Sequence, residues 1–145
     1  MLLTVTAFAD SEKKVTMHEL PAAVQQAIAQ QSKGATVRGL SREIENGKMT
    51  YEAELTVNNH GKDISFDAAG KIVGVEEEVP LASVPQGARA AIQKAVGAGK
   101  LQKVEAVTEN GVTAYEATIV RPGKSSERAG KSSETTFSAD GARAK

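Results

Sequence analysis

Hydrophobic and polar residues alternate with two different periods along this chain, and the period distinguishes helices from strands. Apolar positions spaced by three and four residues predict amphipathic helices that start near Leu20 and Val84. Strict alternation from Met49 to Val57 instead predicts a strand with one apolar and one polar face. The chain is therefore expected to be an α+β protein.

A long internal repeat relates the two halves of the chain. At an offset of 64 residues (85 − 21), residues 20–56 align with residues 84–120 without a gap, and nine positions are identical. The identities recur at matching features, namely a proline at each helix start, an Asn-Gly pair and a Tyr-Glu-Ala motif. Because Asn-Gly supplies the positive φ angles of a tight turn, each helix should be followed by an antiparallel hairpin.

The repeat predicts two tandem α-β-β-β(-β) units, each an antiparallel meander sheet with one helix packed on one face. We place the first unit at residues 10–78 and the second at 79–145. Beyond the aligned window, Phe66 matches Phe137 at an offset of 71, so the second copy holds seven extra residues (71 − 64). We expect them in a long Gly/Ser/Lys-rich loop at 121–133, and we expect the last strand of the second copy to be a stub or absent.

The first nine residues are typical of the end of a secretory signal peptide. Residues 2–9 form a short apolar run that ends in Ala-Phe-Ala, which has small residues where signal peptidase requires them. No basic residue precedes the run, so we expect the leader to begin upstream of Met1; the alternative is a first edge strand. Export predicts a periplasmic or secreted protein whose mature chain begins near Asp10. No apolar run reaches spanning length, so no integral membrane segment is expected.

Composition argues against several classes of function. Lys+Arg 18 and Asp+Glu 18 give a net charge of +0, which does not favour nucleic acid as a partner. Without cysteine there are no disulfides or thiolate metal sites, and 2 histidines leave little for other metal chemistry. No Gly-x-Ser-x-Gly elbow is present, and the Gly-Ala-Gly-Lys at 97–100 ends a helix where a phosphate loop would begin one. We therefore expect no enzyme activity, no catalytic residues, no metal and no cofactor.

Three further features are interpreted as ordinary surface. His18 and His60 lack partners at ligand spacing and are expected to be solvated turn residues. The three glutamates at 76–78 lack the interleaved Asp, Asn and Gly of a calcium loop and are expected to be a solvated linker. From Arg121 onward basic residues exceed acidic ones by three (6 − 3), but no aromatic residue alternates with them, so phosphate or glycan binding is not favoured.

Several motifs resemble a known family. The Leu-Pro-x-x-Val helix start at 20–24, the Tyr-Glu-Ala strand at 51–53 and the Phe-Asp-Ala-Ala-Gly-Lys-Ile turn at 66–72 are similar to the PepSY-like domains of exported bacterial proteins, a group related in fold to the beta-lactamase inhibitor protein. The resemblance covers residues 18–142 in two copies, and the second copy departs from it first at Val84. It implies an extracytoplasmic location and binding or inhibition rather than catalysis, and it brings no catalytic residues.

The sheet side without a helix, called here the open face, is the candidate binding surface. Strand alternation places two equivalent sets of residues on it: Thr50, Glu52, Glu54 and Thr56 in the first copy, and Ala114, Glu116, Thr118 and Val120 in the second. In the inhibitor that the family resembles, such a surface binds an enzyme.

We therefore expect a non-catalytic exported module that binds an envelope protein or peptide. The binding residues are expected to be Thr50, Glu52, Glu54, Glu116 and Thr118. The alternatives are a small-ligand or metal carrier of the cell envelope and a purely structural envelope component. The sequence sets neither the partner's identity nor the oligomeric state.

Tight inhibition of a beta-lactamase is not expected. The chain has no tryptophan, and its aromatic residues outside the leader, at repeat-paired positions, are expected to anchor the two cores: Tyr51, Phe66, Tyr115 and Phe137. Interface hot spots are most often Trp, Tyr or Arg. The purified chain should not inhibit class A beta-lactamases at nanomolar concentration, and an assay of substrate hydrolysis that showed such inhibition would contradict this prediction.

Overall fold

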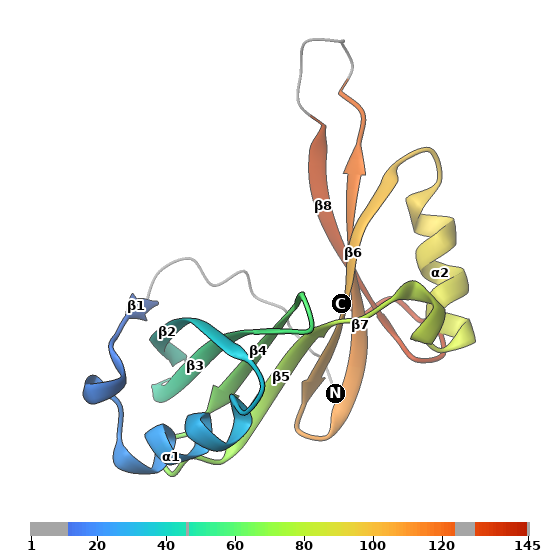
Figure 1. Cartoon of the computed structure of the whole chain (residues 1–145). Coiled ribbons are helices and arrows are strands. Elements are labelled where there is room, and N and C mark those ends of the chain that lie inside the picture. Colours follow the sequence, from blue (N-terminus) through green and yellow to red (C-terminus); the bar gives the residue numbers. More distant parts are fainter. Residues whose placement is uncertain (1–11, 46, 124–129, 145) are drawn as a thin grey trace. The chain divides into compact units, whose positions relative to one another are not determined.

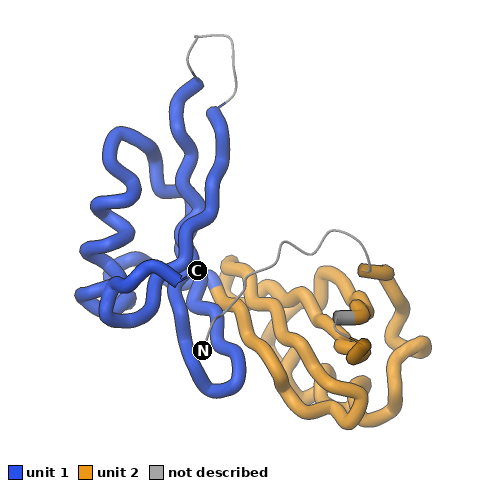
Figure 2. The backbone as a smooth tube through the Cα atoms, turned by 180° about the vertical axis from the view of Figure 1, so that it is seen from behind, with its two compact units in different colours: residues 1–5, 78–145 blue, residues 6–77 orange. Residues whose placement is uncertain are grey.

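The computed structural model describes residues 12–45, 47–123 and 130–144 (Figure 1). The predicted signal-peptide segment, residues 1–9, lies outside the described residues. The rest divides into two compact units, an N-terminal unit that ends at Glu77 and a C-terminal unit that begins at Glu78 (orange and blue in Figure 2). Each unit is an antiparallel sheet with one α-helix, which confirms the predicted α+β class.

The N-terminal unit is a five-strand meander in which every described strand pairs with the next. Its elements are β1 (Lys13–Lys14), the 3-10 helix η1 (Met17–Glu19), α1 (Ala22–Gln31), β2 (Thr36–Glu45), β3 (Lys48–Val57), β4 (His60–Phe66) and β5 (Ile72–Glu78). All four pairings are antiparallel. β1 contributes only two pairs to the edge of β2.

The C-terminal unit repeats this order with fewer strands. Its elements are η2 (Leu81–Ser83), α2 (Gln86–Val96), β6 (Lys100–Glu109), β7 (Val112–Arg121) and β8 (Lys131–Ser138). β6 pairs antiparallel with β7, and β7 with β8. After β8 the chain turns back and makes a single bridge between Phe137 and Arg143. Within the described residues, the last strand of this repeat is therefore the predicted stub.

The core of the N-terminal unit lies between α1 and one face of its sheet. Val24 and Ile28 of α1 are 0% and 1% exposed, and they pack with buried residues of β3 and β4. Ala53 and Leu55 of β3 are each 1% exposed, as the alternation along that strand predicts. Phe66 is fully buried at the end of β4.

The C-terminal unit has an equivalent core under α2. Ala88 and Ile92 of α2 are fully buried against Val104, Ala117 and Ile119 of β6 and β7. Phe137 completes this cluster as Phe66 completes the first, and the two tyrosines at 51 and 115 pack against their own clusters. The aromatic residues are thus core anchors, as predicted from their repeat-paired positions.

Tight two-residue turns connect the long strands. Asn110 and Gly111 have φ angles of 50° and 77°, which confirms the predicted Asn-Gly hairpin. The turn expected at residues 58–61 is shorter than predicted: Asn58 and Asn59 have φ angles of 49° and 67°, and β4 begins directly after them. His60 is consequently the first residue of a strand and is half-buried, whereas the sequence suggested a solvated turn residue.

The predicted long loop at 121–133 is shorter than expected. β7 continues to Arg121, and β8 already begins at Lys131, which pairs with Arg121. Both ends of the Gly/Ser/Lys-rich stretch therefore extend a hairpin, because Ser, Thr and Lys side chains are compatible with an exposed strand. Residues 124–129 lie outside the described part of the chain.

Each helix begins without a side-chain cap. Pro21 and Pro85 are the N-cap residues of α1 and α2, one position before the first helical turn in which they were expected, and their side chains provide no capping hydrogen bond. In place of a side-chain cap, the turn that follows β4 or β8 lies against the start of the helix in the same unit. In the C-terminal unit, the Ala88 N–H donates to the Ala139 carbonyl of this turn at 3.2 Å.

Glycines allow the turn and the helix to approach this closely. Gly70 and Gly141 occupy equivalent turn positions and have positive φ angles of 79° and 91°. A Cβ atom on Gly70 would lie 2.5 Å from the Ala23 carbonyl oxygen of α1, and one on Gly141 would lie 2.5 Å from the Gly87 carbonyl oxygen of α2. Only a residue without a Cβ atom fits where backbone meets backbone.

Replacing Gly70 with alanine should lower the free energy of unfolding by about 2–4 kcal/mol, because left-handed strain and steric overlap add. Gly34→Ala is the matched control, since Gly34 has a φ of +75° but nothing within 4 Å of its would-be Cβ atom. In this variant only backbone strain should lower the free energy of unfolding, by about 1–2 kcal/mol. Urea denaturation measures both, and equal losses would show that the contact with α1 contributes nothing.

Candidate functional site

The open face of the N-terminal unit is built by cross-strand rows of polar residues. One row joins Ser41 of β2, Glu52 of β3 and Ser65 of β4, and the next joins Gly39, Glu54 and Asp63. The Asn58–Asn59 turn between β3 and β4 sets which residues of these two strands are paired. It places the carboxylates of Glu54 and Asp63 directly opposite each other. Directly opposed like charges destabilise a sheet unless a cation lies between them.

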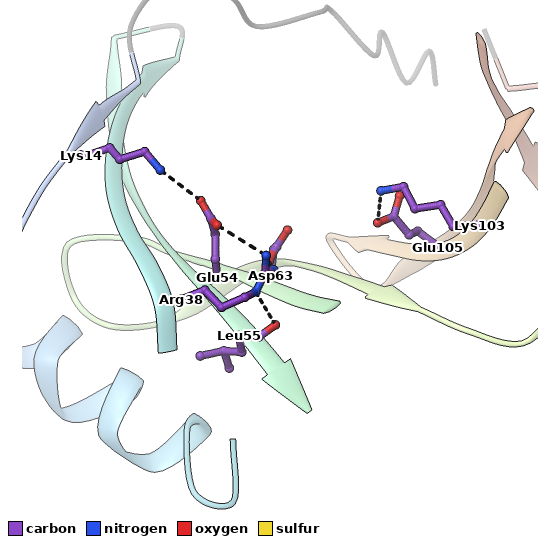
Figure 3. Close-up of polar contacts among 7 residues, drawn as sticks. All are labelled: Lys14, Arg38, Glu54, Leu55, Asp63, Lys103 and Glu105. Carbon is purple, nitrogen blue, oxygen red and sulfur yellow. Dashed lines mark hydrogen bonds and ion pairs between the residues drawn. The ribbon is translucent and has the colours of Figure 1, made fainter. Parts of the chain in front are cut away.

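Arg38 supplies that cation. Its Nη1 lies 3.9 Å from Glu54 Oε2 and its Nη2 lies 3.3 Å from Asp63 Oδ1, while its Nε donates to the Leu55 carbonyl at 3.4 Å (Figure 3). Lys14 of β1 approaches the other oxygen of Glu54 at 3.9 Å. All four charged side chains are at least partly exposed, so these ion pairs orient the groups more than they stabilise the fold.

A β-bulge places Arg38 on this face. The register between β2 and β3 shifts between Val37 and Gly39, which leaves Arg38 as the extra residue of β2. The next residue, Gly39, lies under the Glu54 carboxylate, where a Cβ atom would come within 3.3 Å of the carboxyl carbon. The same bulge recurs between Leu101 and Lys103 in the C-terminal unit.

Glu52 lies at the centre of the N-terminal open face and is half-buried. Burial, followed by the nearby negative charges of Asp63 and Glu12, raises the pKa of Glu52 to about 7. Among the residues that the structure describes, no hydrogen bond or ion pair to the Glu52 carboxylate is found. The face therefore holds a carboxyl group that exchanges its proton near neutral pH.

The open face of the C-terminal unit also centres on a glutamate, but its neighbours differ. Glu116 stands opposite Glu105 of β6 and accepts a hydrogen bond from Thr136 Oγ1 of β8 at 3.1 Å. Burial raises the pKa of Glu116, and the Thr136 hydrogen bond opposes this shift. Glu105 is buried, and Lys103 Nζ approaches its Oε1 at 2.6 Å (Figure 3).

The two copies therefore neutralise their carboxylates in different ways. At the repeat offset of 64, Ser41 corresponds to Glu105 (105 − 41) and Gly39 corresponds to Lys103 (103 − 39). The second copy adds an acidic residue beside its central glutamate and adds a lysine to pair with it. The first copy instead pairs its acidic row with the bulged Arg38.

The predicted site residues lie on the expected faces but are less exposed than expected. Thr50, Glu52 and Glu54 are half-buried on the N-terminal open face. On the C-terminal open face Glu116 is half-buried, while Thr118 is only 5% exposed. Thr118 lies between the longer side chains of Lys103 and Glu134, and within the described chain its Oγ1 has no hydrogen-bond partner. Alternation predicts the face of a side chain but not how its neighbours cover it.

Sequence reasoning missed the ionic neighbours of these residues. Two cross-strand pairs follow from the position of a tight turn, because the turn sets the strand register. The Asn58–Asn59 turn pairs Glu54 with Asp63, and the Asn110–Gly111 turn pairs Glu105 with Glu116. Arg38 carried no such signal, because the bulge that moves it appears only in the paired structure.

His60 has a partner that its sequence neighbourhood did not show. Its Nε2 lies 3.4 Å from Glu77 Oε1, and Lys62 Nζ lies 3.5 Å from the other oxygen of the same carboxylate. Glu77 is thus a strand residue with two basic neighbours, not part of a solvated linker. The other histidine, His18, is exposed in η1.

Sequence comparison assigns this chain to a family. Residues 8–73 and 49–121 match the family described as "Putative beta-lactamase-inhibitor-like, PepSY-like". The two matches together span 114 of the 145 residues (121 − 8 + 1), so the chain belongs to the PepSY-like family. No curated protein matches the chain.

Solved structures from three Bacteroides species share the fold. One of "putative periplasmic proteins" from B. eggerthii is 17% identical with a TM-score of 0.67, and the match covers 87% of this chain and 86% of that one. A DUF2874 family protein from B. uniformis is 18% identical over 86% of both chains with a TM-score of 0.63. A "BLIP-like protein" from B. fragilis is 19% identical over 86% of this chain and 82% of its own, with a TM-score of 0.58.

Neither α1 nor α2, nor any other helix in the described part of the chain, has the length and apolar character needed to cross a bilayer.

Glu52→Gln should stabilise the protein at pH 8 and not at pH 4. The folded-state pKa of Glu52 is about 7 against an ordinary value of 4.5, so the wild type loses stability as pH rises from about 4.5 to about 7. The glutamine variant avoids this loss and should be more stable by roughly 1–3 kcal/mol at pH 8, allowing for partial solvation. Urea denaturation across this pH range measures the difference.

Glu54→Gln provides the control for that experiment. It removes a carboxylate from the same face, but one that contacts Lys14 and Arg38, so it should bring no gain at pH 8. A Glu52→Gln variant no more stable than the wild type at pH 8 would contradict the burial of the charged group.

Proposed function

We propose that this chain is an exported, non-catalytic module that binds a protein or peptide through the open faces of its two units. The binding residues are Thr50, Glu52 and Glu54 in the N-terminal unit and Glu116 and Thr118 in the C-terminal unit. The partner is an envelope protein or peptide that presents positive charge to these faces.

The half-buried carboxyl group of Glu52 carries this proposal. Keeping a charged group there disfavours folding above pH 7, because its pKa is raised to about 7 and none of the described residues pairs with it. A residue that opposes stability and is repeated in the second copy as Glu116 is best explained by a role in binding. A cationic group of a partner would supply the missing ion pair.

Family membership and the solved neighbours support the same conclusion. The family description contains the words beta-lactamase-inhibitor-like, and one neighbour is described as BLIP-like, which are terms for proteins that bind another protein. Another neighbour is described as periplasmic, in agreement with the signal-peptide-like N-terminus. Both point to an exported binding module with no reaction of its own.

The expected interaction is electrostatic and of moderate affinity. The aromatic residues that commonly dominate tight interfaces are used in the cores here, with Phe66 at 0% and Phe137 at 6% exposure. Carboxylates on an open sheet instead favour rapid, salt-sensitive association with a basic partner.

Capture experiments with matched variants test the proposal. The chain is immobilised and exposed to an envelope extract of its host, and bound proteins are identified by mass spectrometry. The double variant Glu52→Gln, Glu116→Gln should lose the specific partner, because it removes the central carboxylate of each open face. It should fold at least as well as the wild type above pH 7, so poor folding does not explain the loss.

The control is the double variant that carries both Gln30→Lys and Gln93→Lys. It changes the net charge by the same amount, +2, at exposed positions of α1 and α2. It should retain the partner. Equal capture by both double variants, or loss in both, would contradict binding through the open faces. A small molecule that remained bound in native mass spectrometry would favour a carrier instead.

A further inference from the structure

Among the described residues, no strand covers the outer edge of β8 (Lys131–Ser138) from Lys131 to Glu134. At its C-terminal end the returning chain covers it: the Ser138 N–H donates to the Ala142 carbonyl and the Ala144 N–H donates to the Thr136 carbonyl, both at 2.9 Å. Because strand residues alternate, the N–H and C=O groups of Glu134 and Ser132 point to the same outer side.

Within the described chain, these outward groups meet no further strand. β8 pairs with β7 on one side, and on the other side its described backbone pairing is with the stub at residues 142–144. Residues Lys131 to Glu134 are exposed, which agrees with an edge that is open to solvent.

In the N-terminal unit, another strand covers the equivalent edge. β4 is the counterpart of β8, and its outer edge is covered by β5 through antiparallel pairs that run from Lys62–Glu77 to Phe66–Ile72. At the offset of 71 that relates the third strands, Asp63 corresponds to Glu134 (134 − 63). Among the described residues, the same sheet edge is therefore filled in one unit and vacant in the other beyond the bridge at Arg143.

We propose that the vacant edge of β8 binds an extended, basic segment of another protein, which adds as an antiparallel fourth strand where β5 lies in the N-terminal unit. The backbone groups of Ser132 and Glu134 would pair with the incoming strand. This site uses backbone groups of a sheet edge, whereas the proposed function uses side chains of the open faces, and Glu116 is the one residue that both involve.

Charge and side-chain size define the segment that fits. On the open face, the incoming strand would run beside Glu134, with Glu116 one strand further in, so every second residue should be Lys or Arg. Lys103, which stands opposite Thr118 on β7, is already paired with Glu105. On the helix side the neighbours are Ser133 and Thr135, so the intervening residues should be small or polar.

A peptide of about seven alternating threonine and lysine residues, with blocked termini, is a suitable probe for an edge of this length. It is titrated into the full chain, and the amide signals of Ser132 and Glu134 are followed by NMR together with their hydrogen exchange. Both amides should shift and exchange at least about tenfold more slowly, since they gain hydrogen bonds. A threonine–glutamate peptide should have no such effect.

Two variants separate backbone pairing from charge. Ser132→Pro removes an outward N–H and is compatible with an edge strand, so the variant should keep the wild-type unfolding midpoint and bind the peptide about tenfold more weakly or worse. Glu134→Gln should weaken binding less and reduce its dependence on salt. Glu109→Gln, which removes an exposed carboxylate at the end of β6, should leave peptide binding unchanged.

The remaining outcomes would overturn the proposal. No change at Ser132 and Glu134 at millimolar peptide would mean that the edge is not a strand-binding site. Equal binding of the glutamate peptide would contradict the selection for basic segments. A dimer in sedimentation whose Ser132 and Glu134 amides are already protected would assign the edge to a second copy of this chain. A failure of the capture experiment, with success here, would refute only binding through the open faces.

Discussion

Each unit depends on a single short helix that covers one face of its sheet. α1 and α2 have 10 and 11 residues, and the side chains they bury, such as Ile28 and Ile92, contact the apolar positions of the strands. Burial of apolar surface is the main stabilising force in a domain of this size, at about 25 cal/mol per Å². Since each described unit has one α-helix, the other sheet face has no helix over it and carries polar residues such as Glu52 and Glu116.

Polar residues on that face are crowded because neighbouring strands lie close together. Glutamates at the centre of a sheet lose part of their hydration, and each additional carboxylate in the same or the next row makes ionisation harder. The two copies respond with different cations, Arg38 in one and Lys103 in the other. The central glutamate is nevertheless present in both copies, where its burial opposes ionisation.

Much of the fold could be predicted from the sequence because it depends on local signals. Alternation identified the buried Ala53 and Leu55, and the Asn110–Gly111 pair located a hairpin. The neighbours of the site residues were harder to predict, because they depend on the register in which the strands pair. The pKa of Glu52 is raised first by burial and second by the charge of Asp63, and both arise only once β3 is paired with its neighbouring strands. The ends of the 121–133 stretch were misassigned since Ser- and Lys-rich segments are compatible with both loops and exposed strands.

The duplicated bulge in the first hairpin of each unit has a consequence for how the two copies can diverge. Arg38 and Gln102 stand at the same place in the same backbone irregularity, yet one is a cation and the other is neutral. The bend is therefore independent of the side chain that it presents. A substitution at this one position changes the charge beside the acidic rows without altering the framework, so the open faces of the two copies can differ in charge while their backbones stay alike.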